Sequence, residues 1–374
     1  MGATGLTIGP LALSTPVVLA PMAGVTNATY RGICRRFGGG IFVSEMTSAR
    51  GIVERSAKSL GFVRFTAGDS VRSVQLYGVE PEIVAGAVKI VVDELGADHV
   101  DLNFGCPVPK VTRKGGGSAV PAHPVLFEAI VRAAVVAAGA APVTVKMRLG
   151  IDDSLITAFE AGRRAEAAGV AAITLHARTA EQHYSGSARW SAIARLREEV
   201  TSIPVLGNGD IWHASDAVRM MRETGCDGVV VGRGCLGRPW FFAELDAALR
   251  GDSTLPPPPT MAEVCAIVLE HAVGLADEDG DERRALLAMR KHLGWYFHDV
   301  DLGSEVRSAL VGATTLEAFD AALARVVETG GSLPAVVRPR GPSGGPKRVV
   351  LPDGWLDAAL DPTPPTDAVD AIGG

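Results

Sequence analysis

The sequence lacks the cysteine pairs that disulfide frameworks and structural zinc sites require. Its 374 residues include 5 cysteines, an odd number, and no two of them form a Cys-x-x-Cys pair. This pattern excludes a disulfide-stapled secreted domain and favours a reducing compartment, so we expect a cytoplasmic protein. The histidine, serine and carboxylate residues show neither metal-ligand nor catalytic-triad spacing, and we expect no metal.

Charge is absent from the first 30 residues, where Arg31 is the first basic residue. A secretory signal peptide needs a basic start before its apolar run, so the sequence predicts none. Prolines interrupt this apolar stretch, and Arg132 and Pro142 interrupt another one between residues 129 and 145. Neither stretch is suited to cross a bilayer, so we expect no membrane span.

Net positive charge is also missing, although the charges are unevenly distributed. The formal charge is −6, which argues against a general nucleic-acid coat. Residues 1–240 hold 25 basic and 21 acidic residues, whereas residues 241–334 hold 7 and 16. Four of those seven basic residues lie close together within this acidic segment. The cluster is interpreted either as a phosphate-binding patch or as partners in ion pairs on a helix surface. The four residues are Arg283, Arg284, Arg290 and Lys291.

What the sequence does contain is an even alternation of short apolar runs and helical stretches. The runs are apolar throughout, as expected of strands buried on both faces of a parallel sheet. Eight strand–helix units in about 240 residues predict an α/β fold, the (β/α)8 TIM barrel. An open doubly wound sheet is the alternative. The predicted strands are Val17–Ala20, Ile41–Val43, Ser73–Tyr77, His99–Asn103, Val143–Met147, Ala172–His176, Pro204–Leu206 and Gly228–Gly232.

Composition divides the chain into three parts. The barrel is predicted over residues 1–245, and a proline-rich break at Leu255–Pro259 follows it. Residues 260–333 have helical periodicity without strand runs, which predicts a small all-helical C-terminal domain. Residues 334–374 hold 8 prolines and 6 glycines, which predicts a mostly disordered tail that leaves room for one short element around Trp355.

Glycine-rich residues stand at the ends of the last two predicted strands. The seventh strand ends in Asn208, Gly209 and Asp210, and the eighth in Gly232 and Arg233. In a TIM barrel these two loops usually form a phosphate site, because glycine lets a phosphate approach backbone N–H groups. We therefore expect a phosphate-bearing ligand there, with plain turns as the alternative.

Two polar residues, Lys146 and Gln75, lie within apolar strands. A lysine that faces the inside of a barrel is costly unless a partner compensates its charge, whereas one that reaches outward to solvent needs no partner. Gln75 can both donate to and accept from a planar heterocycle. The pair indicates a cofactor with an electron-rich ring edge, such as a reduced flavin.

Cys106 differs from the other four cysteines because it lies in the loop after the fourth strand. The other four are interpreted as apolar core residues. Arg113, Lys114 and three glycines follow Cys106, as expected of a lid that closes over an anionic substrate. His176 and Arg178, at the end of the sixth strand, would face the same cavity.

Together these residues resemble the tRNA-dihydrouridine synthases. The resemblance runs in order from about Ile8 to about Val327 and extends to the helical region of the bacterial B-type branch. The segments that carry it are Ala20–Gly24, Asn103–Pro107, Arg113–Lys114, Lys146, His176–Thr179, Asn208–Asp210, Gly232–Arg233 and Arg290–Tyr296.

The resemblance implies an FMN-dependent barrel with a helical tRNA-binding domain. Such an enzyme reduces the C5=C6 bond of uridines in the D-loop of tRNA, with NADPH or NADH as reductant, and Cys106 would be the proton donor. A monomer is expected. The residues predicted to bind FMN are Pro21, Met22, Ala23, Gln75, Lys146, His176, Asn208, Gly209, Asp210, Gly232 and Arg233. Those predicted to bind tRNA are Asn103, Lys110, Arg113, Lys114, Arg178, Arg283, Arg284, Arg290 and Lys291.

The implied chemistry suits these residues. A thiol with an ordinary pKa of about 8.5 is protonated at neutral pH and can act as a general acid. The target base must leave its stack before it can react.

Two alternatives stay open: an FMN barrel that reduces a free pyrimidine or a small enone, and a non-enzymatic tRNA-binding chaperone. The added helical region argues against the first, and Cys106 argues against the second.

Overall fold

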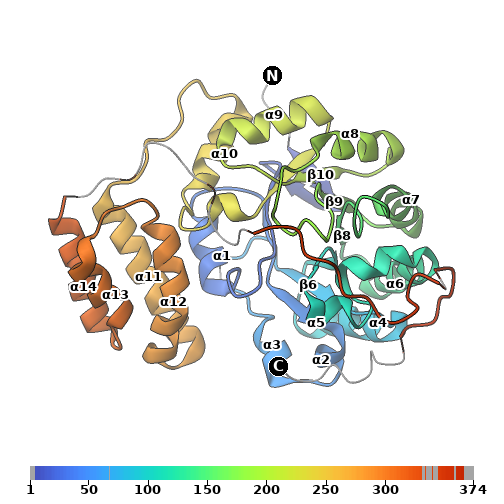
Figure 1. Ribbon diagram of the computed structural model, residues 1–374, viewed down its shortest axis with the longest axis horizontal. Helices are drawn as coiled ribbons and strands as arrows, with labels where there is room; N and C mark the ends of the chain where they lie inside the picture. The colour runs from blue at the N-terminus through green and yellow to red at the C-terminus, as the bar shows by residue number, and fades with distance from the viewer. Residues whose placement is uncertain are drawn as a thin grey trace.

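The computed structural model describes residues 5–66, 68–330, 333, 339, 344–357 and 359–365. Figure 1 shows a barrel of strands and helices, with a row of further helices at its side. None of the helices in these ranges combines the length and the apolar character that crossing a membrane requires.

The described residues form a nine-stranded parallel sheet in the order β4-β3-β11-β10-β9-β8-β7-β6-β5. Edge strand β4 lies within the second predicted strand, and edge strand β5 follows it as an unpredicted continuation. Between them, the Val43 N–H donates to a β3 carbonyl and the Ser44 N–H to a β6 carbonyl, which closes the ring. The (β/α)8 prediction is thereby confirmed. The strands are β3 (Val17–Leu19), β4 (Ile41–Phe42), β5 (Met46–Ser48), β6 (Ser73–Tyr77), β7 (His99–Phe104), β8 (Val143–Arg148), β9 (Ala172–His176), β10 (Val205–Asn208) and β11 (Gly228–Val231).

Helices cover the outside of this sheet, as the apolar strands require. In α6, for example, buried residues recur at intervals of three and four, from Leu126 to Ala138, so one stripe faces the strands. The outer helices are α1 (Ala28–Arg35), α2 (Ala49–Val53), α3 (Ala57–Gly61), α4 (Pro81–Lys89) with a π-helical turn (Ile90–Glu94), α6 (Pro124–Ala138), α7 (Ala158–Ala168), α8 (Trp190–Glu199), α9 (Ala214–Thr224) and α10 (Phe241–Arg250).

A hairpin closes the bottom of the barrel. Strands β1 (Leu6–Ile8) and β2 (Leu11–Leu13) are antiparallel, and their buried leucine and isoleucine side chains pack on inward-facing residues such as Val18 and Leu206. Because the bottom is filled, any ligand site must open at the carboxyl ends of the strands. Two short loop helices lie at that open end after β7, namely α5 (Pro109–Thr112) and a 3-10 helix (Gly117–Ala122).

The helical region has its own apolar core, distinct from that of the barrel. Its helices are α11 (Met261–Asp279), α12 (Glu282–Tyr296), α13 (Gly303–Gly312) and α14 (Leu316–Glu328). A capping box between Thr260 and Glu263 begins α11. The prediction of an all-helical C-terminal region is confirmed. However, α10 runs to Arg250 and packs in the barrel core, so the barrel continues past the predicted limit at residue 245.

Contacts between α1 and α11 join the two parts. The Tyr30 ring lies 5.3 Å from that of His271, and the Thr29 N–H donates to the Glu278 carboxylate over 2.5 Å. The Arg64 guanidinium donates to the Glu278 carbonyl over 2.6 Å. This packing places the C-terminal half of α12 beside the open end of the barrel.

The end of the chain forms what we call the strap, residues 344–357 and 359–365. The strap has no helix or strand, yet its Trp355 is only 6% exposed and packs in the barrel core. A disordered segment does not bury a tryptophan, so Trp355 marks the short element that the sequence left open within the mostly disordered tail. The other residues predicted to be disordered, apart from residue 339, lie outside the described ranges.

Candidate active site

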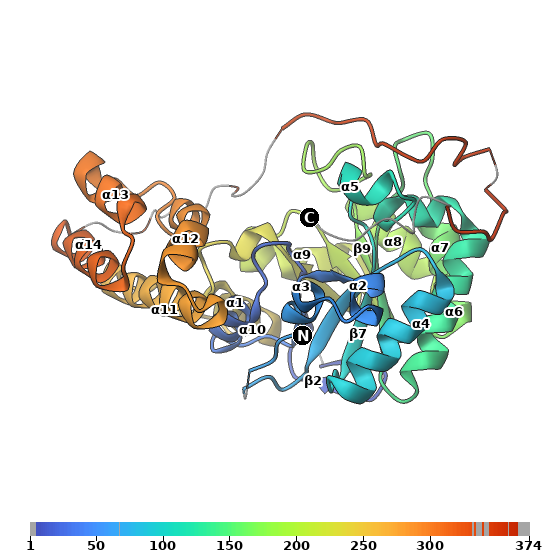
Figure 2. The ribbon, with the colours of Figure 1, turned by 90° about the horizontal axis from the view of Figure 1, so that it is seen from below.

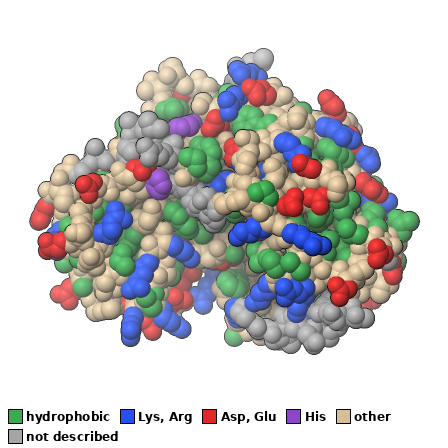
Figure 3. Space-filling view, viewed as in Figure 1, with side chains coloured by type: hydrophobic (Ala, Val, Ile, Leu, Met, Phe, Trp, Pro, Cys, Tyr) green, Lys and Arg blue, Asp and Glu red, His purple; other side chains and the backbone are tan. Residues whose placement is uncertain are grey.

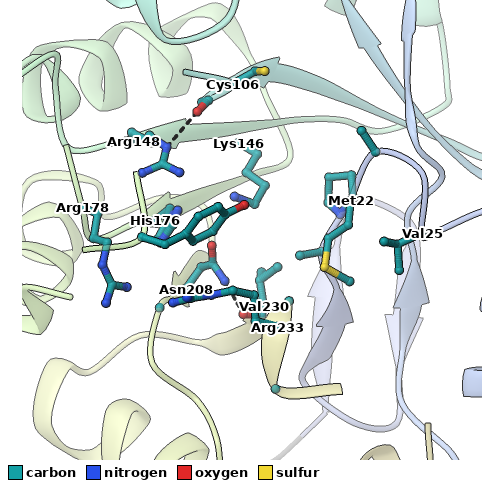
Figure 4. A pocket seen from close by; sticks show the side chains of 18 of the residues that line it. Met22, Val25, Cys106, Lys146, Arg148, His176, Arg178, Asn208, Val230 and Arg233 are labelled. Atoms are coloured by element: carbon teal, nitrogen blue, oxygen red, sulfur yellow. Dashed lines mark hydrogen bonds between the residues drawn. The ribbon is translucent and has the colours of Figure 1, made fainter. Parts of the chain in front are cut away.

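A cavity of about 330 Å3 opens at the carboxyl ends of the strands, at the small end of the range typical of ligand pockets. Figure 4 shows side chains from several strands converging on it. All the residues predicted to bind FMN line this cavity, together with the predicted proton donor and two of the predicted tRNA-binding residues. They are Pro21, Met22, Ala23, Gln75, Lys146, His176, Asn208, Gly209, Asp210, Gly232 and Arg233, with Cys106, Asn103 and Arg178.

A hydrogen-bonded row of side chains crosses strands β6, β7 and β8 at the floor of the cavity. The Gln75 amide donates to Asp101 over 2.7 Å and accepts from the Asn103 amide over 2.8 Å. Asp101 also accepts from the Thr144 hydroxyl over 2.6 Å. These bonds fix the direction of the Gln75 side chain, because both its donor and its acceptor ends are held.

Lys146 lies on β8, and its side chain points into the cavity rather than outward to solvent. Burial, and then the nearby charge of Arg148, lower the pKa of Lys146 to about 8, against the opposing effect of the Asp101 carboxylate. Burial raises the pKa of Asp101 to about 6. Both groups therefore carry their charge at neutral pH, and the ammonium is available to an electron-rich ligand.

The loops after β9, β10 and β11 form one end of the cavity. The Arg178 guanidinium donates to both Asp210 carboxylate oxygens over 2.8 Å, but its buried Nη1 has no hydrogen-bond partner. A Cβ at Gly209, where φ is +128°, would lie 2.7 Å from the Ala188 side chain. A glycine backbone and a buried guanidinium nitrogen without a hydrogen-bond partner suit an anionic ligand such as a phosphate.

Arg233 and His176 complete this end of the cavity. The Arg233 guanidinium lies 4.4 Å from the centre of the Tyr184 ring and 5.0 Å from that of Trp212, so two aromatic faces hold it. Burial, and then the charge of Arg148, lowers the pKa of His176 well below its usual range. His176 is therefore neutral at physiological pH.

Cys106 lies at the rim, in the loop after β7. Its N–H donates to the Asn103 side chain over 2.9 Å, and its carbonyl accepts from the Ser118 N–H over 3.0 Å. Burial raises the pKa of the Cys106 thiol, so the thiol carries its proton at neutral pH. The other four cysteines of the chain are buried, whereas Cys106 is partly exposed.

The dihydrouridine synthase family model matches residues 18–329. The chain belongs to the dihydrouridine synthase family. It is 50% identical to a probable tRNA-dihydrouridine synthase of Mycobacterium tuberculosis (strain H37Rv), over 98% of this chain and 96% of the relative. It is 49% identical to that of Mycobacterium leprae, over 94% and 98%. It is 39% identical to tRNA-dihydrouridine synthase B of Xanthomonas axonopodis, over 85% and 97%.

Several further residues line the cavity of this dihydrouridine synthase family member without having been predicted. Arg148 follows Lys146 by two residues on β8, so the alternation of a strand could have revealed it. It donates to the Gly105 carbonyl over 2.9 Å, a bond drawn in Figure 4, and to the Thr179 carbonyl over 3.0 Å. The aromatic residues come from loops and α12, where no periodicity indicates them. The unpredicted lining residues include Met46, Arg148, Tyr184, Trp212 and Trp295.

The basic residues of α12 do not act as one group. Lys291 reaches the rim of the cavity, since its Nζ lies 3.0 Å from where a Cβ on Gly24 would be. By contrast, Arg284 pairs with Asp281 over 3.7 Å, and Arg290 donates to a carbonyl of α13 over 3.0 Å. The ion-pair alternative therefore applies to Arg284, whereas Lys291 lies at the cavity rim, near the Glu45 carboxylate.

Other predicted tRNA-binding residues stay on the surface. Lys110 and Arg113 are exposed, Lys114 is half-buried, and all three lie in the loop that carries Cys106. Arg283 is exposed on α12. Figure 3 shows Lys and Arg side chains flanking the notch between the helical region and the barrel. The two basic groups thus lie on different parts of the molecule.

Proposed function

We propose that this protein reduces the C5=C6 bond of uridine in tRNA to 5,6-dihydrouridine, with bound FMN, NADPH as reductant and Cys106 as proton donor. The observation that carries the proposal is one cavity that joins an anion-binding end, a buried lysine and a protonated thiol. Family membership supports the reaction class. A cytoplasmic monomer stays a prediction.

The cavity has residues that fit FMN. The unsatisfied Arg178 Nη1 and the backbone at Gly209 and Gly232 would hold the phosphate, with Arg233 nearby. Lys146 and the oriented Gln75 would hold the ring edge, with the ammonium favouring negative charge there. When bound, and once reduced by NADPH, FMN would supply the hydride that the uracil C6 receives.

Cys106 would complete the reduction at C5 of the uracil. Its S–H bond breaks, the proton forms the new C–H bond at C5, and the electron pair stays on sulfur as a thiolate. The raised pKa of the thiol keeps the proton in place until this step. Arg148 and Lys146 both act to lower the thiol pKa, so these cations would stabilise the thiolate that remains.

The substrate would enter from the side of α12. A uridine that leaves its stack needs an aromatic surface and a phosphate partner near the entrance. Trp295 lines the cavity and Lys291 lies at its rim, both on α12. These positions support a role for the helical region in tRNA binding.

The test compares substrates with the holoenzyme. Purified protein with NADPH should convert uridine to dihydrouridine in an unmodified tRNA transcript, and mass spectrometry of the digested tRNA detects the 2 Da gain of the added hydrogen pair. Free uridine and small enones should leave NADPH unconsumed. Reduction of the small molecules, but not of tRNA, would replace this proposal with the small-molecule alternative.

A further inference from the structure

The strap lies over the open end of the barrel, next to the loop that carries Cys106. Figure 2 shows it (dark red) crossing that end beside α5, and Figure 1 gives the same placement. It lies outside the residues that match the family model. Its Lys347 N–H donates to the Glu181 carbonyl over 2.8 Å, and its Val349 is buried against the neighbouring loops.

Trp355 is the main anchor of the strap. Its indole N–H donates to the Ala119 carbonyl over 3.1 Å, and its own carbonyl accepts from His123 Nε2. The Trp355 and His123 rings are in contact, with centres 3.7 Å apart. The anchor therefore combines ring packing with two hydrogen bonds. These contacts are to Ala119, within the 3-10 helix, and to His123, the residue before α6.

The strap also contacts Gly115, which precedes Ala119 and His123 in the chain. A Cβ on Gly115 would lie 2.8 Å from the Trp355 ring and 2.7 Å from Pro365, so the strap leaves room only for glycine. The strap thus holds the cysteine loop at two places, Gly115 and the residues from Ala119 onward.

Cys106 packs against the stretch between those two places. The Ser118 N–H donates to the Cys106 carbonyl over 3.0 Å. A Cβ on Gly117 would lie 2.6 Å from that carbonyl oxygen and 3.1 Å from the Cys106 Cβ. The contacts therefore run without a break from Trp355, through residues 115–119, to the backbone of Cys106.

We propose that Trp355 is a positioning residue for Cys106. By contacting residues 115–119 at both ends, the strap holds the backbone of Cys106 in place and thereby the direction of its thiol. The proposal rests on the proposed role of Cys106 as proton donor. A general acid must lie within hydrogen-bond reach of the atom it protonates, so a loosened loop slows that step.

The first measurement is the rate at which iodoacetamide alkylates Cys106 in the FMN-loaded protein, followed by peptide mass spectrometry. Because the other four cysteines are buried, the rate reports on the cysteine loop. Trp355→Ala should raise it at least about fivefold. Leu360→Ala, a strap residue that is 73% exposed, is the matched control and should leave it unchanged.

A milder variant, Trp355→Phe, tests the proposal even if Trp355→Ala does not fold. Trp355→Phe keeps a ring but loses the N–H that Ala119 accepts, and it should raise the alkylation rate about twofold. Wild-type alkylation rates in Trp355→Phe, and in Trp355→Ala wherever that variant folds, would overturn the proposal.

The second measurement separates this proposal from the proposed function. In single turnover, Trp355→Ala should slow flavin reoxidation by tRNA about tenfold and leave flavin reduction by NADPH unchanged. Unchanged reoxidation in a variant with faster alkylation would overturn the positioning role. If wild-type flavin is not reoxidised by tRNA at all, the proposed function fails, and the positioning role, which rests on it, is overturned with it.

Discussion

Replacing the buried lysine of the cavity tests the electrostatic account of the site. Lys146→Met removes the charge but keeps an unbranched side chain of similar size. The pKa of Lys146 is lowered from 10.5 to about 8, so without a ligand the folded protein disfavours the ammonium. We therefore expect the ligand-free variant to be more stable than the ligand-free wild type at pH 7, while its affinity for FMN falls.

The magnitude follows from linkage between protonation and folding. Between pH 8 and 10.5 the unfolded chain binds the Lys146 proton and the folded chain does not, so wild-type stability gains from this group as the pH rises. The gain is about 1.4 kcal/mol for each pH unit, or about 3 kcal/mol in all. Below pH 8 both states hold the proton, and the cost to the folded state is constant.

The assay is urea unfolding of both ligand-free proteins at pH 7, 8, 9 and 10. The stability advantage of Lys146→Met should shrink by about 2.5 kcal/mol across this range. The difference between the proteins cancels the titrating groups other than Asp101, whose pKa the Lys146 charge lowers. Lys58→Met, at an exposed lysine, is the control and should show a constant difference. A constant difference for Lys146→Met as well would refute the argument that burial depresses the lysine pKa.

Three further predictions concern the anion site, the domain division and tRNA binding. Arg178→Lys should weaken FMN binding about tenfold in a flavin-fluorescence titration, because lysine has no second nitrogen to replace the buried Nη1. Limited proteolysis should cut first within residues 251–260, which have no helix or strand, and separate the barrel from the helical domain; resistance there would argue against the division. Lys291→Gln should lower tRNA affinity and reduce its salt slope by about 1, whereas Arg284→Gln, already paired with Asp281, should change neither.

The sequence predicted the barrel because parallel strands buried on both faces leave apolar runs that local reading can find. It did not predict that the second strand divides into β4 and β5. The division brings Glu45 to the cavity rim, where it accepts the Gly24 N–H and lies near the Lys291 charge. The placement of Glu45 depends on contacts between distant segments of the chain, and the local hydrophobic pattern of the sequence cannot predict such contacts.

The sequence predicted those site residues whose type is unusual for their position in a strand or loop. It missed residues that reach the site only through contacts between distant segments. Lys146 was found because a lysine in an apolar strand has few structural explanations. Tyr184 and Trp212 were missed because an aromatic residue in a loop is ordinary until its neighbour, here Arg233, is known. The sequence suggested a short element around Trp355 but not where it packs, because its partners lie more than 200 residues earlier in the chain.

Single-turnover kinetics of Cys106→Ser show whether Cys106 protonates the uracil. The variant should bind FMN and be reduced by NADPH like the wild type, because neither step uses the thiol proton. Flavin reoxidation by tRNA, followed at the flavin absorbance in a stopped-flow instrument, should slow by roughly 10²- to 10⁴-fold. Reoxidation by tRNA at the wild-type rate would contradict the account and remove Cys106 as the acid.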